Sequence, residues 1–158
     1  MAYDRAVIYV VASSAERTAY ANTDRLKTVN STVYLSFPMK YVAYNGVHLS
    51  PNVREEIKAY RDDNTRNLTR VTASGLKSGI TIDIMGGLNN AAKKEIVAWF
   101  TSHESVALQR KISLLYYDAD SDAYKTGTFY RANPDFDMLY TTENDIIWDA
   151  FTIELVEY

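Results

Sequence analysis

The chain has 158 residues, of which 17 are basic and 20 acidic, and it contains no cysteine. This length predicts a single domain over residues 1–158, and 47% hydrophobic with 23% charged residues is typical of a folded rather than a disordered protein. The lack of cysteine excludes disulfides and thiol chemistry, and a net charge of −3 without a basic run argues against sequence-specific binding of nucleic acid.

The first apolar stretch, Val7–Ala12, mixes β-branched residues with tyrosine and predicts a strand. It is shorter than the about 18 residues of a membrane-spanning helix, so we expect no membrane partner. A secretory signal is an alternative, but the nearly neutral residues before this stretch favour the strand. Residues 12–31 are polar and predict an extended N-terminal arm or loop with at most a short helix, which Ser13 and Glu16 would cap.

The next elements are predicted to be strands. Thr32–Phe37 is rich in strand-forming residues and ends at a proline. Asn45-Gly46 lies between two short apolar runs and predicts a hairpin with a type I′ turn, because both central positions of that turn need a positive φ. The stretch Val53–Arg61 fits a helix and a strand equally well.

Two alternating runs, Leu68–Ala73 and Ile80–Met85, predict half-buried strands joined by the loop 74–79. The main helix follows at residues 88–103, where apolar residues recur at helical spacing and asparagines can cap the start. The large side chains of Trp99 and Phe100 would hold this helix on a sheet.

Three further strands are expected in the C-terminal third, at Lys111–Tyr117, Tyr124–Arg131 and Ala150–Tyr158. The whole pattern predicts a mainly β (α+β) protein, an antiparallel β-barrel or β-sandwich flanked by one α-helix. The positions expected in its core are Ile82, Ile84, Ile96, Trp99, Phe100, Leu114, Phe151 and Ile153.

Known catalytic and metal-binding patterns are missing from the sequence. Asp118–Asp122 resembles the start of a calcium loop, but Ala123 and Phe129 occupy the positions that need Gly and Glu, so a hairpin turn is the better interpretation. His48 and His103 are the only histidines, and no partner has metal-ligand spacing. We therefore predict no catalytic residue, no cofactor and no metal. A hydrolase whose catalytic carboxylates are dispersed along the chain is one alternative hypothesis, because such acids leave no sequence pattern.

Tyrosine is the unusual residue, with 13 copies against 5 Phe and 2 Trp. Tyrosine is enriched in interfaces because it buries a large area and keeps a hydrogen-bonding tip. The alternative is that these residues only serve strand propensity. The tyrosines predicted to lie at subunit interfaces are Tyr20, Tyr41, Tyr44, Tyr117, Tyr124, Tyr130 and Tyr140.

From about Lys40 to Tyr158 the order of these segments resembles small tail and baseplate components of long-tailed bacteriophages, in the tail-tube, tail-hub and distal-tail group. The segments that carry the resemblance are Tyr44-Asn45-Gly46-Val47, Arg66–Arg70, Ile80–Ile84, the helix ending at Trp99-Phe100, Tyr116-Tyr117-Asp118, Thr128-Phe129-Tyr130, Trp148 and Leu155-Val156-Glu157.

The resemblance implies a β-barrel or β-sandwich with one helix that assembles into a ring, commonly a hexamer, in the virion tail. It implies assembly in the host cytoplasm, contacts with adjacent tail or baseplate proteins, and no enzyme activity. Exposed sheet edges and phenol groups would suit closure of such a ring by strand addition between copies. The alternative function is a carbohydrate- or peptide-binding β-domain whose tyrosines form one platform.

Overall fold

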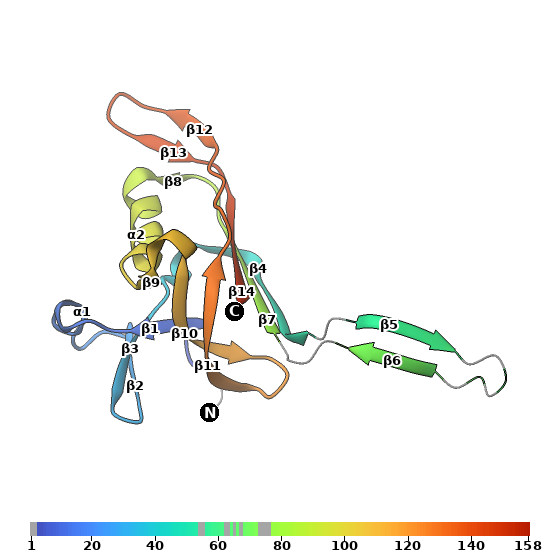
Figure 1. Ribbon diagram of the computed structural model, residues 1–158. Helices are drawn as coiled ribbons and strands as arrows, with labels where there is room; N and C mark the ends of the chain where they lie inside the picture. The colour runs from blue at the N-terminus through green and yellow to red at the C-terminus, as the bar shows by residue number, and fades with distance from the viewer. Residues whose placement is uncertain (1–2, 54–55, 62–63, 65, 67, 73–76) are drawn as a thin grey trace.

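Antiparallel strands dominate the computed structural model, which describes residues 3–53, 56–61, 64, 66, 68–72 and 77–158. Nine strands form one sheet that curls into a half-barrel (Figure 1), in the order β2-β3-β1-β10-β11-β14-β7-β4, with β9 paired to β10. The strands of this sheet are β1 (Ile8–Val11), β2 (Leu26–Val29), β3 (Thr32–Ser36), β4 (Val42–Val53), β7 (Lys77–Ile84), β9 (Glu104–Val106), β10 (Lys111–Asp118), β11 (Ala123–Arg131) and β14 (Phe151–Glu157).

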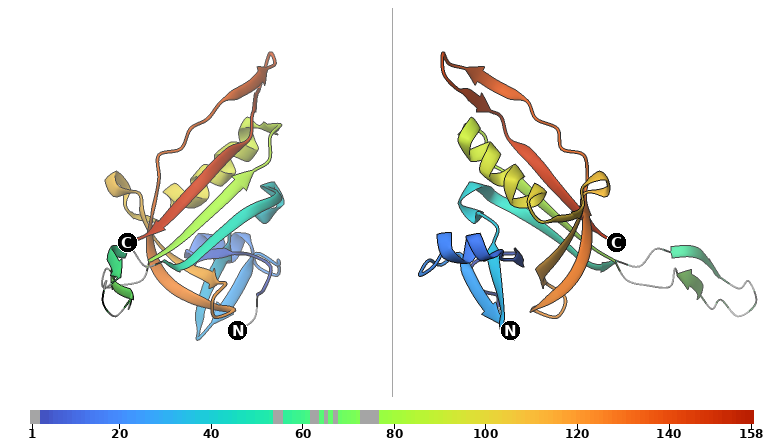
Figure 2. Two further views of the ribbon diagram at one scale, coloured as in Figure 1. Left: turned by 90° about the vertical axis from the view of Figure 1, so that its right-hand side faces the viewer. Right: turned by 60° about the vertical axis from the view of Figure 1, so that its left-hand side comes forward.

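Two smaller sheets contain the other described strands. One is three-stranded, in the order β12-β13-β8, and the other is the pair β5-β6. These strands are β12 (Met138–Thr141), β13 (Ile146–Trp148), β8 (Leu88–Asn89), β5 (Glu56–Arg61) and β6 (Leu68–Thr72). Both β12-β13 and β5-β6 extend away from the half-barrel in different directions (Figures 1 and 2).

The helices are few, as the sequence predicts. The described helical segments are α1 (Ser14–Ala19), α2 (Asn90–Thr101) and the short 3₁₀ turns η1 (Met39–Tyr41) and η2 (Ala107–Gln109). The predicted fold class, mainly antiparallel β with one main helix, is confirmed. None of the described helices combines the length and the apolar character needed to span a bilayer.

The core lies on the inner face of the curled sheet, where α2 covers it. Side chains alternate between the two faces of β7 and β14, so Ile82 and Ile153 are buried on the inner face. The residues on either side of each isoleucine along its strand are more exposed. From α2, Trp99 packs edge-to-face on Phe37 and donates its indole N–H to the carbonyl of Ser36 at 3.0 Å. All eight positions expected in the core are buried: Ile82, Ile84, Ile96, Trp99, Phe100, Leu114, Phe151 and Ile153.

The prediction of a hairpin at Asn45-Gly46 is wrong. Both residues lie inside the single strand β4, where the pairing with β7 shifts register between Val42 and Val47. Asn45 has a φ of 56°, which a bulge can use as well as a turn can. A Cβ on Gly46 would lie 2.7 Å from the carbonyl oxygens of Ala43 and Asp83, so the glycine permits close approach of two strands rather than a reversal of the chain.

Residues 12–31 are more ordered than a loop. Ser13 and Glu16 form the predicted capping box at the start of α1, but Leu26–Val29 is the strand β2, paired to β3. The isolated sequence of β2 shows too little alternation to indicate a strand, and its pairing to β3 supplies the missing stability.

Other boundaries also differ from the prediction. The main helix was expected at 88–103 and spans Asn90–Thr101, because Asn89 is its N-cap and pairs in β8. Glu56–Arg61 is a strand, which decides between the two interpretations of that stretch. Residues 73–76, where one predicted strand ends and its loop begins, lie outside the described residues.

Candidate functional site

The seven tyrosines predicted at interfaces lie at several separate places. Tyr117 and Tyr124 belong to one cluster on the outer face of the sheet. Tyr20 packs on the guanidinium of Arg25 at 4.9 Å, and Tyr41 donates its hydroxyl to Glu95 Oε2 at 2.6 Å. The other three are exposed on different strands: Tyr44 on β4, Tyr130 on β11 and Tyr140 on β12. The tyrosines therefore do not form a single platform.

The cluster on the outer face joins four tyrosines edge to face. Ring centroids lie 5.4 Å apart for Tyr3 and Tyr117, 5.5 Å for Tyr117 and Tyr124, and 5.7 Å for Tyr124 and Tyr9. Tyr9 is fully buried, and its burial strongly raises the pKa of its phenol. Tyr3 and Tyr9 were not among the tyrosines predicted at interfaces: Tyr3 precedes the predicted strand Val7–Ala12, and Tyr9 lies within its apolar run.

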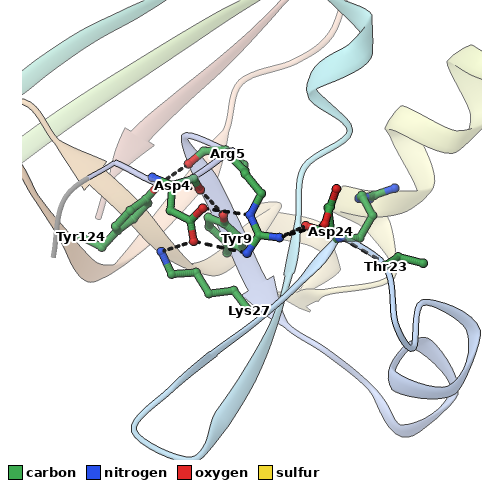
Figure 3. A network of polar contacts seen from close by, with 9 residues as sticks. Asp4, Arg5, Tyr9, Thr23, Asp24, Lys27 and Tyr124 are labelled. Carbon is green, nitrogen blue, oxygen red and sulfur yellow. Dashed lines mark hydrogen bonds and ion pairs between the residues drawn. The ribbon is translucent and has the colours of Figure 1, made fainter.

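These phenols hold the segment 3–6 against the sheet (Figure 3). The hydroxyl of Tyr124 accepts a hydrogen bond from the amide of Asp4 at 3.0 Å and donates to the carbonyl of Ala6, and the hydroxyl of Tyr9 donates to the carbonyl of Asp4. The Asp4 carboxylate accepts from Arg5 Nε at 2.9 Å, and this hydrogen bond, with the charge of Lys27, lowers the pKa of Asp4.

Lys27 is a buried cation on the edge strand β2, with its side chain 5% exposed. Its ammonium lies 3.5 Å from Asp4 Oδ2 and 4.0 Å from the centre of the Tyr124 ring (Figure 3). A buried lysine is tolerated where a carboxylate and aromatic faces replace its water. The buried ammonium makes no hydrogen bond, so the nearby Asp4 charge and the aromatic faces stabilise it. Together, Asp4, Tyr9, Lys27 and Tyr124 hold the N-terminal segment on the sheet, which suits a structural role.

Beside this network lies an open groove of about 420 Å³. Three basic residues, Arg5, Arg25 and Lys40, line it together with Asp24 and with Pro38 and Met39. Glu95 of α2 is shared between two of the cations, at 3.9 Å from Arg25 and 4.0 Å from Lys40. Arg5 pairs with Asp4 at 2.9 Å and with Asp24 at 3.6 Å, so each cation of the groove has a carboxylate nearby. We call this the charged groove. Nothing in the sequence alone brings these residues together, because they come from three different segments.

The sheet has two outer edges. Among the described residues, β2 pairs only with β3 and β4 pairs only with β7, so each presents one side of its backbone without a neighbouring strand. Both edges have features that limit uncontrolled pairing: the inward-pointing cation Lys27 in β2, and in β4 Pro51 and a shift of register beside Asn45-Gly46. In β4 the regular pairing with β7 covers Val47–Ser50.

The ribbon of β12 and β13, residues 138–148, carries three consecutive exposed apolar residues. We call it the distal ribbon. All four residues of β12 are exposed, with Met138, Leu139 and Tyr140 each more than half exposed. Of these three, only Tyr140 was predicted at an interface. The apolar run Met138–Tyr140 directly before the polar residues 141–145 could have indicated the other two.

Each histidine lies beside one carboxylate. His103 Nε2 lies 2.7 Å from Glu16 Oε1, and His48 Nε2 lies 3.3 Å from Asp83 Oδ2. Within the part of the chain that the structure describes, no group of three metal-ligating side chains occurs. Asp118–Asp122 is the turn between β10 and β11, and the Asp118 carboxylate is used by Ser121, Lys125 and the amide of Asp120.

Comparison with known proteins gives a family but no activity. Neither the curated proteins nor the solved structures contain a match to this chain. One family model matches residues 26–158, which include every strand from β2 onwards, the helix α2 and the distal ribbon. The chain therefore belongs to the family of unknown function DUF6711.

Proposed function

We propose that this protein is a structural subunit of a bacteriophage virion tail, a tail-hub, distal-tail or tube-like ring protein that assembles with copies of itself and contacts neighbouring tail proteins. The observation that carries the proposal is the open nine-stranded sheet, in which β2 and β4 form two unpaired edges of one half-barrel. An open sheet with two different edges can join head to tail, and such heterologous contacts generate rings when the rotation closes.

The side chains support an assembly role over a catalytic one. The ionisable groups of the outer face are paired internally, as in the network around Asp4 and Lys27. The exposed tyrosines are spread over β4, β11 and β12, which fits several separate contacts with neighbours. The proposed place of the protein in the virion rests on the resemblance of its segment order to phage tail components, with assembly in the host cytoplasm.

The alternative, a carbohydrate- or peptide-binding domain, needs the aromatic side chains on one accessible face. The tyrosine cluster comes nearest to this arrangement, but Tyr9 is buried and the hydroxyl of Tyr124 is bonded to the segment 3–6. A platform built from these rings would have few free hydroxyls for a sugar. We therefore favour assembly.

The test is the mass of the purified protein in solution, measured by light scattering across a wide range of concentrations. We expect a closed oligomer of fixed size that appears as a ring by electron microscopy. A protein that stays monomeric at the highest concentration would contradict the proposal. Antibody labelling of phage particles that carry the gene tests the tail location separately, because a protein absent from the particle cannot be a virion subunit.

A further inference from the structure

The helix α1 has six residues, none of which is buried. A helix of this length is unstable in water by itself, so contacts outside the helix must hold it in place. Within α1, Arg17 and Thr18 form hydrogen bonds back to Ser14. Glu16 links the helix to another element: its Oε1 lies 2.7 Å from Nε2 of His103, just after the C-terminal end of α2.

Both ring nitrogens of His103 face a hydrogen-bond acceptor. Nδ1 lies 2.8 Å from the main-chain carbonyl of Trp99, which can only accept. Ser102 Oγ, 3.1 Å from Nδ1, donates its own proton to the carbonyl of Ala98 and therefore also meets the ring as an acceptor. Nε2 lies against the carboxylate of Glu16. A neutral imidazole has a single N–H, so only the imidazolium, with two, can donate to both sides.

The carboxylate of Glu16 is the constant member of this pair. It also accepts a hydrogen bond from the Ser13 amide at 2.9 Å, as part of the capping box of α1. Burial opposes ionisation of Glu16, but hydrogen bonds from the Ser13 amide and from His103 outweigh it and lower its pKa. Glu16 therefore stays charged down to acidic pH, and histidine is the type of side chain whose charge changes near neutrality.

Neighbouring charged groups are engaged elsewhere. Arg17, next to Glu16 on α1, bonds within its own helix. Glu104, which follows His103, pairs with Arg131 at 3.0 Å, and both of these side chains are more than nine-tenths buried. The side chains of His103 and Glu16 are 12% and 23% exposed, so water screens their interaction only in part.

We propose that His103 and Glu16 form a pH-dependent link: the protonated ring of His103 holds α1 on the end of α2, and α1 is released when the ring loses a proton as the pH rises. After that loss, a lone pair of the ring faces either the Glu16 carboxylate or the Trp99 carbonyl, so one of the two contacts becomes repulsive. The segment 12–25 around α1 joins β1, in the middle of the sheet, to the edge strand β2, and its release loosens this connection. The inference does not depend on the proposed function.

The experiment measures how much of α1 is held on α2 across the range from pH 5 to pH 9. The chain has no cysteine, so Ala19→Cys, at an exposed position of α1, places a single nitroxide label whose electron paramagnetic resonance spectrum separates held from mobile helix. We expect the ratio of held to mobile α1 to fall by about three- to tenfold as the pH rises, a range between an exposed ion pair and a buried one. A label at Lys94→Cys, exposed on α2, is the control and should not respond.

Two substitutions in the labelled protein test the pair itself. Glu16→Gln keeps the capping box, because glutamine also serves at this position, but it removes the negative charge. We expect Glu16→Gln and His103→Gln to leave α1 equally mobile at all pH values. His48→Gln replaces the other histidine, which lies beside Asp83, and should keep the response of the unsubstituted labelled protein. Circular dichroism checks that each variant is folded.

Nitrogen NMR of the His48→Gln variant follows the two ring nitrogens of His103 as the remaining histidine. The loss of the second ring proton should coincide with the release of α1. A held fraction that does not change between pH 5 and pH 9 would overturn the proposal, and so would a ring that keeps both protons throughout. A folded Glu16→Gln variant that retains the full pH response would show that another group controls α1.

Discussion

The β10-β11 hairpin and the distal ribbon are both antiparallel pairs, but their surroundings differ. In β10, Ile112, Leu114 and Tyr116 are buried on the inner face of the half-barrel. In β12, every residue is exposed. The same local structure therefore serves as the centre of a core in one place and as an uncovered surface in the other, and what decides between them is whether a helix and further strands cover the face.

This comparison predicts that side chains in the core of the half-barrel contribute more to the free energy of unfolding than side chains of the distal ribbon do. Trp99→Ala removes a buried indole and its hydrogen bond to Ser36, and it should lower the free energy of unfolding by about 3–5 kcal/mol. Leu139→Ala in the ribbon should change it by less than about 0.5 kcal/mol. Urea denaturation of both variants measures the difference, and similar losses would show that the ribbon belongs to the cooperative unit.

A second prediction concerns the close approach of β4 and β7 within the body. Gly46→Ala places a methyl group 2.7 Å from two carbonyl oxygens and should cost about 1–3 kcal/mol, as overpacking does. Gly79→Ala is the control in the same pair of strands, because its nearest neighbour, Ser50 Cβ, is 3.7 Å away. Thermal unfolding should separate the two variants, and equal melting temperatures would mean that the strands adjust freely at the bulge.

A third prediction concerns acid and the turn of the β10-β11 hairpin. Burial opposes ionisation of Asp118, but hydrogen bonds from Lys125, Ser121 and the Asp120 amide outweigh it and lower its pKa. A lowered pKa in the folded state stabilises the protein above the unfolded value of about 3.9, and this contribution is lost as the pH falls through the folded value.

Asp118→Asn should therefore cost about 1 kcal/mol at neutral pH, the size of a typical net hydrogen bond, and nearly nothing at pH 2. The measurement is chemical denaturation at both pH values, with the wild type alongside. An equal loss at both would mean that ionisation of Asp118 is unimportant. Because Asp4 and Glu16 also have lowered pKa values, the wild type should retain further acid sensitivity after this substitution.

A modest effect is expected where the distal ribbon joins the half-barrel. Asn89 caps α2 through a hydrogen bond from the Ala92 amide and pairs with Ile147 in the three-stranded sheet. Asn89→Ala should cost about 0.5–1 kcal/mol, in the lower range for an N-cap. Hydrogen exchange should quicken mainly in the first turn of α2 and in β13, whereas exchange spread over the whole sheet would show that the cap supports the body.

The sequence was most informative where local pattern and burial agree. The alternation of Ile80–Ile84 and the helical spacing of Ile96, Trp99 and Phe100 identified elements whose apolar faces are in fact buried. It misled at Asn45-Gly46, because positive φ angles serve bulges as well as turns. The candidate site was only partly foreseen: Tyr124 and Tyr41 were named, but their partners Asp4 and Glu95 lie 120 and 54 residues away in sequence.

By itself, the sequence determined the class of the fold, the main helix and eight of the core positions, because the spacing of apolar residues along one helix or strand shows which of its faces is buried. Only the tertiary structure decided which strands lie at the edges, that Lys27 is buried against Tyr124, and that three separate segments form the charged groove. These features depend on contacts between distant segments, whose free energy no local pattern records.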